Sequence, residues 1–297
     1  MAVLSQGKLF DPILLTEVIS KVKGHSSLAK LSTQKAIPFT GSKEFTFSMD
    51  NEIDIVAENG KKSHGGITLE PVTIVPLKIE YGARVSDEYM FASQERKIEI
   101  LSDFVDGFAK KAAKGLDLMA FHGVNPRTGE ASNIIGTNCF DKKVTQTVQF
   151  VELDPDATMG TVVNMIDGAD RDVTGAALDP IFTTAMSKLK NSQGGALYPQ
   201  LAWGGNVDEL NGLPVDKNKT VSAMMSGTKD VAIVGDFQNM FKWGYAKEAF
   251  MKIIEFGDPD NTGVDLAGSN QVYIRAEAYL GWAIFDESSF VRVTKEG

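Results

Sequence analysis

The feature that most restricts the fold is an alternation of side-chain type over residues 67–85. The odd positions of this stretch read Ile, Leu, Pro, Thr, Val, Leu, Ile, Tyr, Ala and Val. A period of two is that of a β-strand, and a fully extended strand of this length would span roughly 60 Å. Strands in compact domains are usually 3–10 residues long. We therefore expect a ribbon that leaves the body of the protein and lies on another surface.

A second alternating segment precedes this ribbon and supplies a partner strand. A polar turn over residues 58–66 separates the two, while Pro71 and Pro76 remove backbone donors and make the later strand an edge or an interrupted one. The exposed apolar surface is large enough to favour burial against a second copy of the chain. We predict that the contact residues are those of the stem and two lysines of the turn: Phe45, Phe47, Met49, Ile67, Leu69, Lys61 and Lys62.

The rest of the chain mixes helices and strands, which predicts the α+β class. Residues 93–122 carry apolar side chains every three or four positions, as in an amphipathic helix of about 45 Å. A second helix is expected over residues 159–169, and a third begins after Asp179 as cap and Pro180 as first residue. Strands are expected at 230–235 and at 272–282, where alternate apolar residues share one face.

Charge is distributed unevenly along the chain. Residues 1–43 contain six lysines against two acids, which gives them a charge of +4. Because the net charge of the chain is −9, the other 254 residues carry −13. A basic arm on an acidic body can dock on a neighbouring copy or on an anionic polymer, and a solvated flexible arm explains the charge equally well. Asp11-Pro12 predicts a short helix within the arm. The overall negative charge argues against a dedicated nucleic-acid binder.

No pattern of catalytic, metal-ligating or cofactor-binding residues emerges. His25, His64 and His122 are scattered without ligands at metal-site spacing, and Cys139 is best explained as a small buried hydrophobe. Residues 258–263 resemble the start of a calcium loop but lack its later ligands, so we expect a solvated acidic turn. We predict no enzyme activity, cofactor or metal. No apolar run is long enough to predict a membrane span, and no secretory signal is recognisable.

Four short segments carry a resemblance to a known family. They are the helix and turn at 178–194, the turn at 210–215, the Gly-Asp-Phe strand end at 234–237 and the closing strand at 272–285. In their order and spacing they resemble the major capsid proteins of tailed bacteriophages, the HK-ninety-seven phage capsid fold family. The likeness covers about residues 36–293.

The resemblance implies a division of the chain. Residues 1–43 would be the N-terminal arm and 44–80 an extended loop. Residues 81–165 and 264–297 would form the peripheral domain, with 93–122 as its spine helix. Residues 166–263 would form the axial domain, which gathers copies around five-fold and six-fold axes.

The resemblance also implies a function. The chain would be a major capsid protein that assembles into an icosahedral shell around double-stranded DNA. It would be made in the bacterial cytoplasm and kept in the virion, with pentamers and hexamers of itself, a separate scaffolding protein and a portal as partners. Within the same fold, the alternative is an encapsulin shell that packages a cargo enzyme. Outside it, the alternative is a soluble enzyme or ligand-binding α+β protein.

Overall fold

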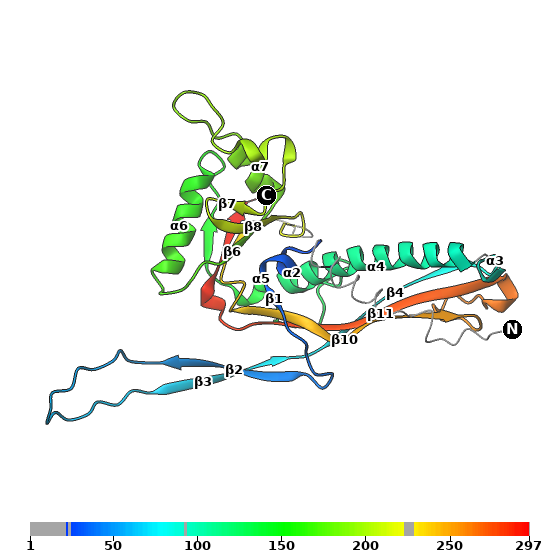
Figure 1. The fold of residues 1–297 in the computed structure, drawn as a ribbon, viewed down its shortest axis with the longest axis horizontal. Helices are drawn as coiled ribbons and strands as arrows, with labels where there is room; N and C mark the ends of the chain where they lie inside the picture. Colours follow the sequence, from blue (N-terminus) through cyan, green and yellow to red (C-terminus); the bar gives the residue numbers. More distant parts are fainter. Residues whose placement is uncertain (1–21, 23–24, 92–93, 223–228, 297) are drawn as a thin grey trace.

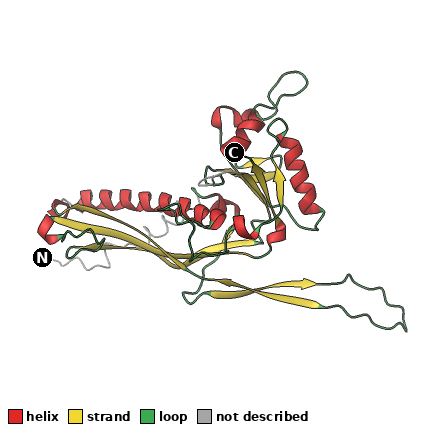
Figure 2. Ribbon diagram, turned by 180° about the vertical axis from the view of Figure 1, so that it is seen from behind, coloured by secondary structure: helices red, strands yellow, loops and turns green. Residues whose placement is uncertain are grey.

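The computed structural model describes residues 22, 25–91, 94–222 and 229–296, and it confirms the α+β class. Three sheets organise these residues: a four-stranded sheet, a six-stranded sheet and a two-stranded hairpin. The four-stranded sheet and one long helix form an elongated body. The six-stranded sheet, with its helices, forms a second unit at one end of that body, and the hairpin projects from the body (Figures 1 and 2).

The long sheet has the order β1-β10-β11-β4 and consists of Thr33–Gln34, Phe241–Ile254, Gln271–Ile284 and Leu77–Ser86. Strand β11 pairs antiparallel with both β10 and β4 along most of its length. Its predicted apolar face is confirmed, because six alternate side chains are all buried: Val272, Ile274, Ala276, Ala278, Leu280 and Trp282. These residues belong to the same core as the long helix above them.

That helix, α4, spans Gln94–His122 after the short helix α3 at Glu88–Phe91, so the long amphipathic helix predicted from the apolar spacing is confirmed over its described residues. Its apolar stripe packs on the sheet through Leu101, Val105 and Phe108. The helix ends where Gly123 takes a positive φ of 67°. A side chain there would lie 2.9 Å from Cys139 Sγ, so both the backbone angle and the space call for glycine.

The six-stranded sheet has the order β5-β12-β9-β6-β8-β7. Its strands are Thr147–Gln149, Phe290–Lys295, Lys229–Gly235, Gly175–Leu178, Leu213–Lys217 and Glu209–Leu210. Helices α6 (Pro155–Asp167) and α7 (Pro180–Ser187) contribute to its core. Further short elements among the described residues are α2, α5, η2, η3 and η4, at Ser27–Leu31, Phe140–Lys143, Pro199–Gly204, Ala267–Ser269 and Glu287–Ser289.

Both predicted helices of this unit are present. Asp179 caps α7 by accepting a hydrogen bond from the Ile181 amide at 2.7 Å, as its sequence predicts. Helix α6 begins earlier than predicted, at Pro155 instead of residue 159. The reason is a second Asp-Pro start, in which Asp154 accepts a hydrogen bond from the Ala157 amide.

The strand expected over residues 67–85 is interrupted, as its prolines predicted, but only its first part leaves the body. Strand β3 (Ile67–Ile74) pairs with β2 (Ser42–Met49) in the hairpin, whereas β4 pairs with β11 in the long sheet. Val75 and Pro76 separate the two strands, and Pro76 has no amide hydrogen to continue a ladder. One alternating sequence thus serves two sheets in turn, and residues 77–80 of the expected extended loop belong to the body.

The domain limits expected at residues 166 and 263 also differ from the sheets. Strand β5 and most of helix α6 lie before residue 166 but belong to the six-stranded unit, and strand β12 lies in that sheet as well. Strand β10 falls inside the expected axial segment, yet it pairs with β11 in the long sheet. The local sequence pattern cannot show which unit a strand joins, because that depends on the distant strand with which it pairs.

Part of the expected arm is held in the body. Residues 1–21, which include the helix predicted after Asp11, lie outside the described residues. Helix α2 lies within the body, with Leu28 and Ala29 buried. The Ser26 hydroxyl and the Ser27 and Leu28 amides donate to the carboxylate of Asp117, on α4.

Asp117 therefore joins three segments. Besides the arm residues, it accepts hydrogen bonds from Asn218 Nδ2 at 3.2 Å and Thr220 Oγ1 at 2.8 Å, which follow strand β8 of the six-stranded unit. Burial raises the pKa of Asp117 to about 6, and the hydrogen bonds only partly oppose that rise. The carboxyl links the arm, the spine helix and the second unit at one buried point.

The raised pKa of Asp117 predicts a pH dependence of stability. The folded state holds the proton of Asp117 more tightly than the unfolded chain does. Protonation of Asp117 therefore contributes about 3 kcal/mol to the free energy of unfolding below about pH 4, and this contribution is lost as the pH rises through about 6. The free energy of unfolding of the native chain, minus that of Asp117→Asn, should therefore fall between about pH 4 and about pH 7. Urea denaturation of unassembled subunits measures it, and an unchanged difference would contradict this assignment.

Candidate subunit interface

The hairpin β2–β3 presents an apolar face that its own chain leaves uncovered. The register places Phe45 opposite Pro71, Phe47 opposite Leu69 and Met49 opposite Ile67, so these side chains share one face. The five predicted stem residues lie 55–70% exposed: Phe45, Phe47, Met49, Ile67 and Leu69. A two-stranded ribbon has too little material to bury such a face by itself.

The root of the hairpin is fixed to the body through its other face. Ile74 is buried against Ile37 and Ala283. Glu44 accepts hydrogen bonds from Lys35 Nζ at 2.9 Å and Lys242 Nζ at 3.2 Å. Partial burial would raise the pKa of Glu44, but the two ammonium groups lower it overall. The hairpin therefore leaves the body in a defined direction, on the side of the long sheet away from α4 (Figure 1).

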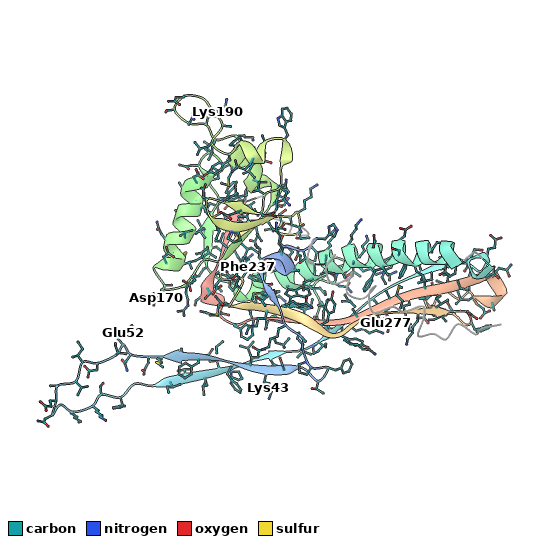
Figure 3. The ribbon with its side chains drawn as sticks, viewed as in Figure 1. Lys43, Glu52, Asp170, Lys190, Phe237 and Glu277 are labelled. Atoms are coloured by element: carbon teal, nitrogen blue, oxygen red, sulfur yellow. The ribbon has the colours of Figure 1, made fainter. Side chains whose placement is uncertain are left out.

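Residues 50–66 close the far end of the hairpin, where Figure 3 labels Glu52. Asp50 Oδ1 accepts a hydrogen bond from the Gly66 amide at 2.6 Å, which fixes the last step of the ribbon. Lys61 and Lys62 are exposed in this loop, as predicted from the polar turn. The loop also carries two almost completely exposed isoleucines, Ile53 and Ile55, at 97% and 96%. Their alternation was visible in the sequence, but they were not predicted as contact residues.

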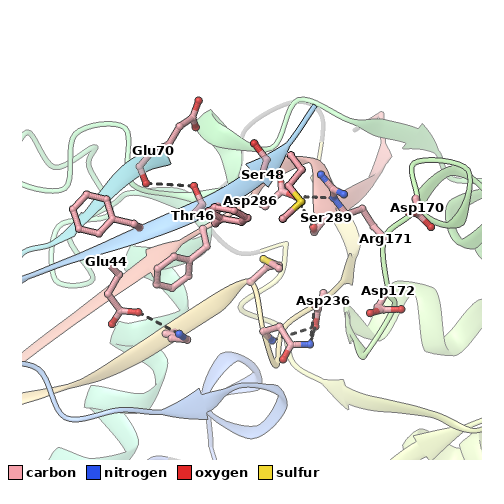
Figure 4. Close-up of a pocket in the computed structure, with 17 residues that line it drawn as sticks. Glu44, Thr46, Ser48, Glu70, Asp170, Arg171, Asp172, Asp236, Asp286 and Ser289 are labelled. Carbon is pink, nitrogen blue, oxygen red and sulfur yellow. Dashed lines mark hydrogen bonds and ion pairs between the residues drawn. The ribbon is translucent and has the colours of Figure 1, made fainter. Parts of the chain in front are cut away.

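A groove of about 730 Å³ lies between the hairpin and the second unit (Figure 4). Six carboxylates line it against two cations: Glu44, Glu70, Asp170, Asp172, Asp236 and Asp286, with Arg171 and Lys242. Both cations are already paired, since Arg171 Nε lies 2.8 Å from Asp286 Oδ2 and Lys242 binds Glu44. The charged part of the lining is therefore negative, which favours a basic segment as its occupant, and Phe45, Phe47 and Met49 of the hairpin line the same groove.

Both His122 and Cys139 are buried in the body. His122 is buried, with Nδ1 2.9 Å from Asp141 Oδ2 and Nε2 2.8 Å from the Thr220 carbonyl oxygen. Cys139 is fully buried, and burial raises the pKa of its thiol. Within the described ranges, no group of three potential ligands is placed to hold a metal ion.

The acidic turn at 258–263 is not simply solvated, because a guanidinium occupies its centre. Arg84 Nη2, from strand β4, lies 2.8 Å from Asp258 Oδ1, 2.6 Å from Thr262 Oγ1 and 2.9 Å from the Val264 carbonyl oxygen. Arg84 Nε donates to Asp260 Oδ2 at 2.9 Å and lowers the pKa of that carboxyl. The side chains that suggested a calcium loop thus bind an internal cation and tie the turn to the long sheet.

Comparison with known proteins agrees with this geometry. The model of the phage capsid family matches residues 7–295. A chain from Mycobacterium phage Ogopogo is 27% identical, with a TM-score of 0.77 over 91% of this chain and 92% of that one. A chain from Gordonia phage Cozz is 22% identical, with a TM-score of 0.74 over 92% and 87%. A search of curated proteins returned no match.

The same fold occurs in the capsid of an empty GTA particle computed with C5 symmetry, which is 15% identical with a TM-score of 0.64 over 92% of this chain and 90% of that one. The chain belongs to the phage capsid family. Its function is that of a major capsid protein, and the encapsulin alternative is not favoured. The family is one of structural proteins. Among the helices described, none is both long and apolar enough to span a bilayer.

The exposed stem residues generate a direct test. Phe45→Ser combined with Phe47→Ser should leave the subunit folded, because exposed positions contribute little to its own stability. Each lost contact should weaken association by about 1–2 kcal/mol, so the concentration needed for assembly should rise roughly tenfold or more. Sedimentation measures assembly, and circular dichroism measures folding.

The matched control is Thr46→Ala combined with Ser48→Ala, which changes the opposite face of the same strand. Equal loss of assembly in both double variants would show that the hairpin matters only through its own folding, and not through its apolar face.

Proposed function

We propose that copies of this chain assemble into an icosahedral shell of pentamers and hexamers, and that the β2–β3 hairpin of each copy lies on a neighbouring copy. The observation that carries the proposal is the exposed apolar face of the hairpin, combined with the rigid anchorage of its root. Buried side chains of this size stabilise a contact by about 1–2 kcal/mol each, before the cost of association is subtracted.

Ring contacts between identical chains are head-to-tail, so the loop at the tip of one hairpin meets a surface other than its own tip. The acidic groove supports a receiving role, because its carboxylates complement Lys61 and Lys62 of another copy's hairpin loop. The apolar stem then supplies most of the binding free energy, and the two lysines supply orientation. The seven predicted interface residues fit this arrangement.

The two structural units fit the two domains of a capsid subunit. We assign the long sheet and α4 to the peripheral domain, and the six-stranded unit to the axial domain. The shell would enclose double-stranded DNA, which the basic N-terminal residues contact without sequence preference. A separate scaffolding protein and a portal would complete assembly in the bacterial cytoplasm, and the protein would remain in the virion. We propose no catalytic turnover and no membrane partner.

Shortening the hairpin loop tests the proposal. Replacing residues 52–65 by a short Gly-Ser turn keeps the Asp50–Gly66 contact and removes both isoleucines and both lysines. Circular dichroism should stay native-like, because residues 52–65 lie outside all three hydrophobic cores. Electron microscopy should show no closed particles. Closed shells of the shortened chain would mean that another element carries assembly.

The arm gives a second test, with a boundary that the structure defines. Deleting residues 1–21 should leave a folded subunit whose assembly is impaired, and the impairment should depend on salt, because a basic segment is removed. Deleting residues 1–35 should instead destabilise the fold, since it removes Leu28 and three donors to Asp117. Thermal unfolding of both deletions separates the two effects. Normal particles from the shorter deletion would refute a role for the arm.

A further inference from the structure

One tryptophan differs from the other two in its surroundings. Trp243 and Trp282 are buried in the main core, at 0% and 1% exposure. Trp203 is fully exposed in the six-stranded unit. A free indole is a large apolar surface in water, and tryptophan is among the side chains most enriched at the energetic centres of protein interfaces. Its exposure therefore calls for an explanation beyond the fold of one chain.

The turn that carries Trp203 has a fixed shape. Leu201, two residues earlier, is buried in the core of the second unit. Trp203 itself has a left-handed backbone, with φ 58° and ψ 26°, which is costly for a residue with a side chain. A side chain at Gly205 would lie 2.2 Å from the Gln200 carbonyl oxygen, so the turn leaves room only for glycine.

A lysine from strand β8 also constrains this turn through two hydrogen bonds. Lys217 Nζ donates to the carbonyl oxygens of Gly204 and of Gly205, the latter at 2.8 Å. The indole is therefore presented on a constrained backbone. Fixing an exposed anchor before binding reduces the conformational entropy lost when a contact forms.

The turn lies at the end of the six-stranded unit that points away from the long sheet (Figure 1). The loop at 188–197 lies at the same end on the other side of α7, where Figure 3 labels Lys190. This loop exposes Lys188 and Lys190, together with Leu197 at 43%. One end of the unit thus carries an exposed aromatic ring on one side and cations with an apolar side chain on the other.

We propose that Trp203 anchors the contact between the six-stranded units of neighbouring copies, by packing on the 188–197 loop of the next copy. Two different surfaces of one unit are what a ring of identical subunits requires. A lysine ammonium over an indole face and an adjacent leucine give that contact both attraction and apolar burial. The inference rests on the proposed assembly and names the residues that would join axial domains around a symmetry axis.

Tryptophan fluorescence tests the contact directly, because Trp203 is the exposed one of the three tryptophans. In free subunits, acrylamide should quench the component that Trp203 contributes. In particles or capsomers isolated by sedimentation from cells that express this chain alone, quenching should fall to the level of Trp203→Phe. Equal acrylamide quenching of Trp203 fluorescence in free and assembled protein would overturn the inference.

Light scattering and electron microscopy follow assembly separately, so the two proposals fail differently. A chain that stays a free subunit at every concentration contradicts the assembly proposal together with this contact. Assembled protein with an accessible Trp203 contradicts the contact alone.

Variants extend the test to the receiving loop. Trp203→Ala should raise the concentration needed for assembly by about tenfold or more, as for a truncated aromatic anchor, whereas Trp203→Phe should retain most of the native behaviour. Lys188→Glu combined with Lys190→Glu should restore acrylamide quenching of Trp203 in whatever assembled protein remains. Native assembly and native protection in the lysine variant would exclude the 188–197 loop as the receiver.

Discussion

The apolar face of the β2–β3 hairpin cannot be buried within one chain, and the remaining structure is arranged around that constraint. Two strands provide no third layer to cover Phe45, Phe47 and Met49. The long sheet and α4 instead form a rigid support from which the hairpin projects at a fixed root. Covering this face with a second copy would remove its apolar surface from water, and this is the driving force that we propose for assembly.

The second unit depends on a different set of contacts. Strands β5 and β12 lie side by side in the six-stranded sheet, and β4 and β11 lie side by side in the four-stranded sheet. Each sheet therefore pairs segments that are far apart in the sequence. Asp117 joins the arm, α4 and the residues after β8 at one buried carboxylate. Arg84 closes the 258–264 turn on the long sheet in a similar way. The Asp117 junction thus ties α4 to the six-stranded unit, and the Arg84 junction holds the turn on the long sheet.

Local patterns predicted the elements whose signals are local. The Asp179-Pro180 start gave α7, and the apolar stripe gave α4. The prolines predicted an edge or interrupted strand, and β3 and β4 do separate at Val75-Pro76, but the period of two could not show that the two parts pair in different sheets. The groove acids and the clamp around Arg84 were missed for the same reason, since segments more than a hundred residues apart form them. Trp203 carried no periodic signal and was recognisable only from its exposure.

The most direct test of the account is a cryo-electron microscopy map of particles assembled from this chain, at a resolution that shows side chains. The account predicts that carbon atoms of Phe45, Phe47 and Met49 lie within about 4.5 Å of carbon atoms of another copy, the ordinary distance of an apolar contact. A closed shell in which these three side chains face solvent would contradict it, because assembly would then proceed without burying the surface held to require it.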